Sequence, residues 1–210
     1  MARNKFWDSQ EKAKAREFIP IYYKKFIGID KLAEDRQYWT LANYQPRNYK
    51  FCETNQMVDT LGFCEREQLV LVDMDGHIVN HNIKHQPECM SIKGEWTKVI
   101  TSNLDFFNPG CIYLDTQNTV NGKEIIRLAE FTMDYCPPET LLVINTSLNN
   151  AHSGERFSKE LLITRLDDVL PNAQKNLWEK EVEVLSYNMT GKTDMGMYFL
   201  FKRGEDAKQA

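Results

Sequence analysis

The sequence predicts an α/β domain of the Rossmann-like type, with three layers and a mostly parallel sheet that ends in an antiparallel C-terminal hairpin. Several apolar runs stop abruptly in polar residues, as strands buried on both faces of a parallel sheet do. Helical segments lie between these runs and the connections are short, which is the pattern of a sheet covered by helices on both sides. The last two strand-like runs are too close in sequence for a crossover helix, so they are expected to pair antiparallel.

Length and composition fit one globular domain. The chain has 210 residues, of which 42% are hydrophobic and 27% are charged, and its formal net charge is -4. These values exclude the disordered and fibrous classes and give no general reason to expect binding to nucleic acid or to acidic membranes. The first residues are too charged for a signal peptide, and no run approaches membrane-spanning length. A cytoplasmic protein without membrane contact is therefore expected.

The cysteines and histidines do not predict a metal site. The five cysteines are odd in number and widely spaced, with no Cys-x-x-Cys pair, which favours reduced structural thiols. His77, His81 and His85 recur every four residues, a spacing that can place imidazoles on one helix face. No further ligand of matching kind is nearby in sequence. We therefore interpret these histidines as part of a solvated helix face.

The chain is expected to divide into a helical extension at residues 1–45, a Rossmann-like domain at 46–204 and a disordered tail at 205–210. No internal repeat and no linker rich in proline or glycine interrupts it.

The N-terminal extension is predicted to contain a helix over residues 9–26. Phe18, Tyr22 and Phe26 recur there at helical spacing, and Pro20 is expected to kink or divide the helix. The segment also mixes aromatic residues with basic ones, a combination that suits contact with a nucleic-acid strand. The basic residues are Arg3, Lys5, Lys12, Lys14, Arg16, Lys24 and Lys25. Acidic neighbours dilute this charge, so an ordinary amphipathic helix is favoured.

The clearest strand of the chain follows. A short strand-like run at 49–52 precedes a predicted helix at about 55–61, which ends at Gly62. Residues 68–72, Gln-Leu-Val-Leu-Val, then form a near-continuous apolar run that stops at Asp73. This pattern is typical of a strand buried on both faces of a parallel sheet.

The alternation continues to residue 144. The predicted elements are a weak helix at 78–85, a short strand at 89–92, a strand at 110–114, an amphipathic helix at 122–135 and a strand at 141–144.

The C-terminal region breaks this pattern. Residues 181–185 and 197–201 are strand-like, and the polar residues 188–196 join them. Parallel neighbours need a long crossover connection, so these strands are expected to form an antiparallel hairpin.

Polar residues follow four of the predicted strands. They are Asp73 with Asp75, Glu95, Asp115 with Thr116, and Asn145 with Thr146. In open parallel sheets, ligands bind at the carboxyl ends of the strands, near the point where the strand order reverses. Any buried strand must end in something polar, but four such ends in series predict a ligand crevice.

Three of these segments resemble motifs of class I S-adenosylmethionine-dependent methyltransferases. LVLVDMDGHIVNHNI, residues 69–83, resembles the second strand and following helix of that family. The resemblance implies that Asp73 binds the two ribose hydroxyls, a task that suits a carboxylate because it accepts two hydrogen bonds. IKGEW resembles the third motif and places Glu95 and Trp96 near the adenine. IYLDTQ resembles the fourth-strand motif, with Asp115 near the transferred methyl group.

The first motif of that family is absent. It is a glycine-rich turn after the first strand, which lets the backbone approach the cofactor closely. Residues 51–56 at the corresponding position contain no glycine, although Glu53 falls where the family often has an acidic residue. The resemblance implies S-adenosyl-L-methionine as cofactor and Asp115 as the candidate catalytic residue. The implied cofactor-binding residues are Glu53, Thr54, Asn55, Asp73, Met74, Glu95, Trp96 and Asp115.

Residues 73–76, Asp-Met-Asp-Gly, also resemble the first motif of haloacid dehalogenase-type phosphatases. In those enzymes the first aspartate accepts the phosphoryl group and the second is the general acid. Residues 145–147 would supply the hydroxyl, Lys159 the lysine and residues 167–168 the magnesium-binding acids. Against this, a long structured stretch precedes the motif, His77 replaces the usual threonine, and Lys159 lies too close to residues 167–168.

The favoured hypothesis is therefore a methyltransferase whose substrate is open, with nucleic acid among the candidates. The alternatives are a non-catalytic module of the same fold that binds nucleic acid or a partner protein, and the magnesium-dependent phosphatase. The missing glycines favour the module, and the acidic residues at the strand ends favour the enzyme.

Overall fold

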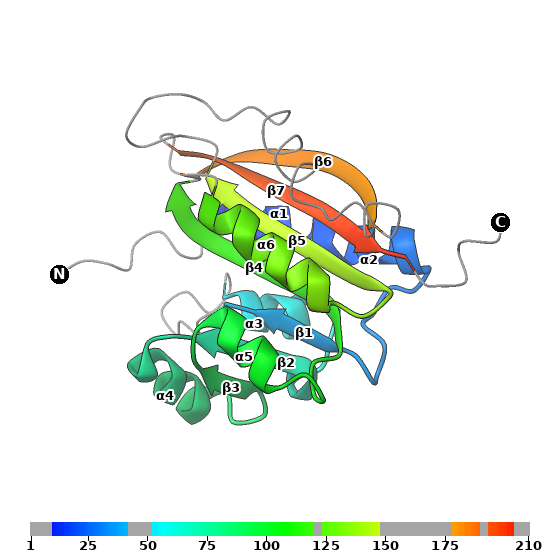
Figure 1. Ribbon diagram of the computed structural model, residues 1–210. Helices are drawn as coiled ribbons and strands as arrows, with labels where there is room; N and C mark the ends of the chain where they lie inside the picture. The colour runs from blue at the N-terminus through cyan, green and yellow to red at the C-terminus, as the bar shows by residue number, and fades with distance from the viewer. Residues whose placement is uncertain (1–9, 42–51, 120–122, 148–177, 190–192, 204–210) are drawn as a thin grey trace.

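Seven strands form one sheet in the order β3-β2-β1-β4-β5-β7-β6 in the computed structural model, which describes residues 10–41, 52–119, 123–147, 178–189 and 193–203 (Figure 1). β1, β2, β3, β4 and β5 pair in parallel, whereas β7 is antiparallel to both β5 and β6. The strands are β1 (Gln37–Thr40), β2 (Leu69–Asp73), β3 (Met90–Lys93), β4 (Pro109–Thr119), β5 (Thr140–Ser147), β6 (Trp178–Met189) and β7 (Thr193–Lys202).

The predicted fold class is confirmed. β6 ends at Met189 and β7 begins at Thr193, which leaves no room for a crossover helix, so the two strands form the antiparallel hairpin that the sequence predicts. β2 lies inside the sheet between β3 and β1, as its continuous apolar run requires.

Helices cover both faces of the sheet and make the expected three layers (Figure 1). Within β2, Val70 and Val72 pack into the core beneath α5 and α6, while Leu69 and Leu71 pack into the core on the opposite face, because successive strand residues point to opposite sides. The helical segments are α1 (Gln10–Arg16), α2 (Phe18–Ile27), α3 (Glu53–Asn55), the π-helical η2 (Gln56–Thr60), the 3-10 helix η3 (Arg66–Gln68), α4 (Gly76–His85), α5 (Trp96–Ser102) and α6 (Lys123–Tyr135).

The N-terminal helices form part of the sheet domain. The predicted helix is divided at Glu17, and Pro20 lies in the first turn of α2, where a missing N–H is tolerated. Tyr22 stacks on Phe199 of β7 with ring centroids 4.1 Å apart, and Phe26 stacks on Phe201 at 4.9 Å. These contacts fix α2 against the face of the sheet.

The first strand is not where the sequence predicts it. β1 is Gln37–Thr40, inside the stretch 1–45 that the sequence assigns to a helical extension, so the sheet does not begin at residue 46. Of the predicted strand at 49–52, residues 49–51 lie outside the described residues, and Cys52 immediately precedes α3. β1 is short and has no apolar run, so its strand character comes from pairing with β2 and β4.

Two further expectations concern the whole chain. All five cysteines are described residues; each is buried and none forms a disulfide, in agreement with the prediction of reduced thiols. Within the described ranges, no helix is long and apolar enough to cross a membrane. The predicted tail at 205–210 lies outside those ranges.

Candidate functional site

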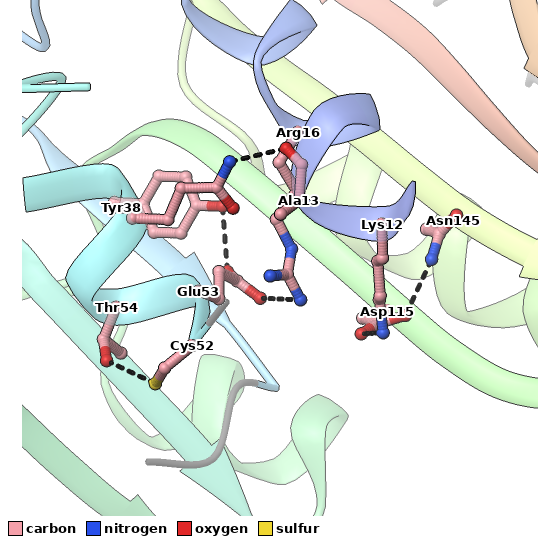
Figure 2. A network of polar contacts seen from close by, with 10 residues as sticks. Lys12, Ala13, Arg16, Tyr38, Cys52, Glu53, Thr54, Asp115 and Asn145 are labelled. Carbon is pink, nitrogen blue, oxygen red and sulfur yellow. Dashed lines mark hydrogen bonds and ion pairs between the residues drawn. The ribbon is translucent and has the colours of Figure 1, made fainter. Parts of the chain in front are cut away.

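The strand order reverses between β1 and β4. From β1 the chain proceeds to β2 and β3 on one side of the sheet, and from β4 to β5 on the other. Ligands of open α/β sheets bind at the carboxyl ends of the strands at this point. In this protein, side chains of α1 and α3 meet there with side chains of β1, β4 and β5 (Figure 2).

Lys12 of α1 forms an ion pair with Asp115 of β4. The lysine is 2% exposed and the aspartate 11%. Asn145 of the neighbouring β5 donates a hydrogen bond of 2.8 Å from its Nδ2 to the other carboxylate oxygen of Asp115, so the two strand ends hold this carboxylate between them (Figure 2). A buried ammonium is strongly disfavoured unless a group of opposite charge compensates it, and Asp115 is that group.

Glu53 of α3 lies in a second cluster beside the first. Its Oε1 accepts a hydrogen bond of 2.9 Å from the Tyr38 hydroxyl, and its Oε2 lies 3.8 Å from Nη2 of Arg16 (Figure 2). The Arg16 guanidinium also stands over the Tyr113 ring, 5.7 Å from its centroid. We call the four charged side chains Lys12, Arg16, Glu53 and Asp115 the switch-point cluster.

Burial is the largest influence on the pKa of Glu53. It raises the pKa of this carboxyl to about 7, and the nearby Asp115 adds to the rise. Arg16 and the hydrogen bonds from Thr40 and Tyr38 act in the opposite direction. A carboxyl with a pKa close to neutrality can take up and release protons in the range where acid–base catalysts work.

Replacing Glu53 by glutamine is expected to flatten the pH dependence of stability between about pH 4.5 and pH 7. Folding raises the pKa of Glu53 from 4.5 to about 7. In that window the folded protein therefore binds more protons than the unfolded chain, and the free energy of unfolding falls as the pH rises, by at most about 1.4 kcal/mol per pH unit. Glutamine does not titrate, so urea unfolding at several pH values should show a shallower slope in the variant than in the wild type.

Glu88→Gln is the matched control, because Glu88 is exposed. It should keep the slope of the wild type. A slope that survives in Glu53→Gln would show that Glu53 titrates as an ordinary exposed carboxyl.

The sequence of α1 explains why two cations reach this point. Lys12 and Arg16 are four residues apart, so they lie on the same face of α1, and both are buried. Gln56 of η2 donates a hydrogen bond of 2.5 Å from its Nε2 to the carbonyl of Ala13, which holds α1 over the strand ends. The sequence contains a sign of this role: Lys12 and Arg16 stand at positions of the amphipathic pattern that face the core. They were not recognised from the sequence as members of a buried site.

Asp73 ends β2 on the other side of β1. Its Oδ1 accepts a hydrogen bond of 2.7 Å from the backbone N–H of Asp75, and burial raises its pKa above the usual value. Met74 beside it is 72% exposed. Asp75 accepts from the backbone N–H of His77 and caps α4. A carboxylate and an exposed apolar side chain thus stand together at this strand end.

Thr54 and Asn55 are buried in contacts that hold α3 in place. The Thr54 hydroxyl lies 3.2 Å from the Cys52 thiol. Oδ1 of Asn55 accepts from Gln86 at the end of α4 and from Arg66 of η3. Only Glu53 of the three predicted residues in this segment joins the switch-point cluster.

Glu95 and Trp96 point in different directions. Glu95 is exposed at the start of α5 and pairs with Lys98 at 2.9 Å. Trp96 is 5% exposed, donates its indole N–H to the Thr132 hydroxyl at 2.9 Å and packs against Trp39. The Trp96 ring therefore belongs to the core beneath α5 and α6, so the structure does not place it beside Asp73 and Met74.

The sequence after β1 also lacks glycine. The first motif of the resembled family follows its first strand. Because β1 ends at Thr40, the corresponding position is the sequence directly after Thr40 and not residues 51–56, where the sequence resemblance placed it. None of the residues between Thr40 and Cys52 is a glycine.

The sheet order disfavours the phosphatase hypothesis. Asp73 and the hydroxyl candidates at 145–147 lie on β2 and β5, with β1 and β4 between them. Three strand spacings amount to about 14 Å, too far for both to contact one phosphoryl group. The described residues contain no group of three or more potential metal ligands, while Lys159 and residues 167–168 lie outside them.

Known structures share this architecture. The chain is similar to an O-methyltransferase from Bacillus cereus in complex with SAH, with a TM-score of 0.59, 10% identity and coverage of 96% of this chain and 84% of that one. It is similar to the N-methyltransferase NodS from Bradyrhizobium japonicum WM9, with a TM-score of 0.53 and 11% identity. The match covers 94% of this chain and 100% of that one. For a putative sarcosine dimethylglycine methyltransferase from Galdieria sulphuraria, the TM-score is 0.56 and the identity is 7%. The match covers 94% of this chain and 92% of that one.

These similarities show that the chain has the Rossmann-like fold of class I S-adenosylmethionine-dependent methyltransferases. No family model matches the chain, and no curated protein sequence matches it.

Proposed function

We propose that the chain is an S-adenosylmethionine-dependent methyltransferase. The observation that carries this proposal is the pair of carboxylates on the two strands that flank β1, in a sheet of the methyltransferase order: Asp73 ends β2, and Asp115 lies in the C-terminal half of β4. These strand ends are two spacings apart, roughly 10 Å, a span that suits a ligand with a nucleoside at one end and a reactive group at the other.

The residues at the strand ends fit the parts of this cofactor. Asp73 offers a carboxylate to the ribose diol, and exposed Met74 offers an apolar side chain to the adenine. The buried charges of the switch-point cluster suit the amino-acid end, which carries charges of both signs. Glu95, at the start of α5, is a candidate for a further polar contact, and Trp96, Thr54 and Asn55 would support the site from the core.

Asp115 is the proposed catalytic residue. When bound, S-adenosylmethionine supplies an electrophilic methyl group, and the protein must align an acceptor and remove its proton. Asn145 donates to Oδ1 of Asp115 and fixes the orientation of this carboxylate. Asp115 would therefore accept the proton of the methyl acceptor at the end of β4.

A specific observation favours the non-catalytic module as the second candidate. The side chains of Lys12 and Arg16 are buried at the switch point, and the sequence between Thr40 and Cys52 contains no glycine. Both features would narrow the space for a cofactor. A module of this fold would bind neither S-adenosylmethionine nor S-adenosylhomocysteine, so a binding measurement separates the candidates.

Replacing Asp73 by alanine is expected to weaken S-adenosylhomocysteine binding by about 1.5–3 kcal/mol, the usual contribution of hydrogen bonds to a charged group. Isothermal titration calorimetry measures the difference between variant and wild type. Asp105→Ala is the control, because Asp105 is exposed and precedes β4 at the opposite end of the sheet. Wild-type protein that gives neither heat nor a thermal shift with millimolar ligand would exclude the enzyme and leave the module.

A further inference from the structure

Lys12 is unusual among the lysines of this protein. Of the lysines whose burial the structure describes, it is the buried one, at 2% exposed, and its ammonium meets the carboxylate at the end of β4. In Figure 2 its side chain extends from α1 to the Asp115 carboxylate. A primary amine is thus held against the proposed catalytic base.

We propose that Lys12 is itself a methyl acceptor, so that the protein methylates its own α1; this inference rests on the proposed methyltransferase function. The amine occupies the place where an acceptor must stand, in contact with the group that would receive its proton. Burial also means that a separate enzyme could not reach this nitrogen in the folded protein, so the methyl group has to come from a cofactor bound at the same strand ends.

The reaction balances with S-adenosylmethionine as the methyl donor. The Lys12 ammonium first gives a proton to the Asp115 carboxylate, which frees the lone pair on Nζ. The lone pair attacks the methyl carbon, the new bond joins that carbon to Nζ, and the carbon–sulfur bond breaks. The electron pair of that bond stays on sulfur, so the sulfonium becomes the neutral thioether of S-adenosylhomocysteine. The positive charge passes to Nζ, so the product is the ammonium form of N-methyllysine, and Asp115 releases the first proton to solvent.

The chain offers a matched control on the same helix. Lys14 is two residues from Lys12 but exposed. Purified protein would be incubated with S-adenosylmethionine that carries a deuterated methyl group and then cleaved after Glu11 and Glu17. Fragment ions of the resulting peptide distinguish label on Lys12 from label on Lys14. We expect label on Lys12 in the wild type and in Lys14→Arg, and none in Lys12→Arg.

A binding measurement supplies a second readout that does not depend on turnover. If the reactive end of the cofactor lies beside Lys12, the lysine repels the sulfonium of S-adenosylmethionine but not the neutral S-adenosylhomocysteine. Lys12→Met removes this repulsion and leaves Asp115 to attract the sulfonium. Calorimetry should then show that the affinity for S-adenosylmethionine, relative to S-adenosylhomocysteine, rises by about fivefold or more.

The outcomes separate this inference from the function on which it rests. Binding of S-adenosylhomocysteine without label on Lys12 would overturn self-methylation and leave the proposed methyltransferase intact. Absence of binding would overturn both. If Lys12→Arg or Lys12→Met does not fold, the wild-type labelling experiment, compared with Lys14→Arg, still decides, because it needs no change at Lys12.

Discussion

Replacing Asp115 by alanine is expected to lower the free energy of unfolding by about 3–5 kcal/mol, the usual cost of removing one partner from a buried ion pair. The substitution leaves the Lys12 ammonium, 2% exposed, without this carboxylate and deprives Asn145 of its acceptor. Urea or guanidinium unfolding measures the loss. The same variant should lack methyl transfer, because no carboxylate remains at the end of β4 to take the acceptor's proton.

Asp59→Ala is the matched control for this loss. Asp59 also pairs with a cation, Arg66, at 2.7 Å, but its side chain is 42% exposed. Removing an exposed pair of this kind costs at most about 1 kcal/mol. Adding Lys12→Met to Asp115→Ala should recover part of the lost stability, because the double variant no longer buries the charge. Equal losses for Asp115→Ala and Asp59→Ala would show that Lys12 is not buried as described.

Trp39→Ala is expected to cost about 3–5 kcal/mol of unfolding free energy, as the loss of a large buried aromatic side chain does. Trp39 is fully buried in β1 and lies edge-on to Phe107, with ring centroids 4.9 Å apart, and to Trp96 at 6.0 Å. Its indole N–H also donates to the Gln37 side chain at 2.7 Å. The cavity would lie between β1 and α5, and denaturant unfolding again measures the effect.

Phe106→Ala provides the comparison for Trp39→Ala. Phe106 also lies near the Trp39 ring, at 6.2 Å, but it is 37% exposed. Its loss should cost much less, roughly 1 kcal/mol, because the ring already meets water and its removal opens no closed cavity. A small loss in Trp39→Ala would contradict the position of β1 inside the sheet, between β2 and β4.

The strands that could be predicted are those with a local signal. β2 and β5 are continuous apolar runs, because both of their faces are buried, and this pattern is visible without any partner. β1 has no such run. Its four residues include Gln37 and Thr40, and they form a strand because β2 and β4 supply hydrogen-bond partners on both sides. That pairing is a long-range property, so the sequence did not reveal it.

The candidate site was predicted to a similar extent. Asp115 was selected because it follows an apolar run, and Glu53 because it falls where the resembled family often has an acidic residue. Both belong to the switch-point cluster. Trp96 was selected from the sequence Gly-Glu-Trp, which does not reveal the direction in which a side chain leaves the first turn of a helix. Its indole turns into the core and bonds to Thr132 of α6.

The sequence by itself determined the fold class, the positions of the polar strand ends and the antiparallel hairpin. Each follows from periodicity or connection length, which are local properties of the chain. Only the tertiary structure decided that β1 lies inside the sheet between β2 and β4, and that α1 brings Lys12 to Asp115, 103 residues away. Periodicity indicates which positions are buried. It does not indicate the partner of a buried charge, because that partner depends on which helix packs against which strands in the folded protein.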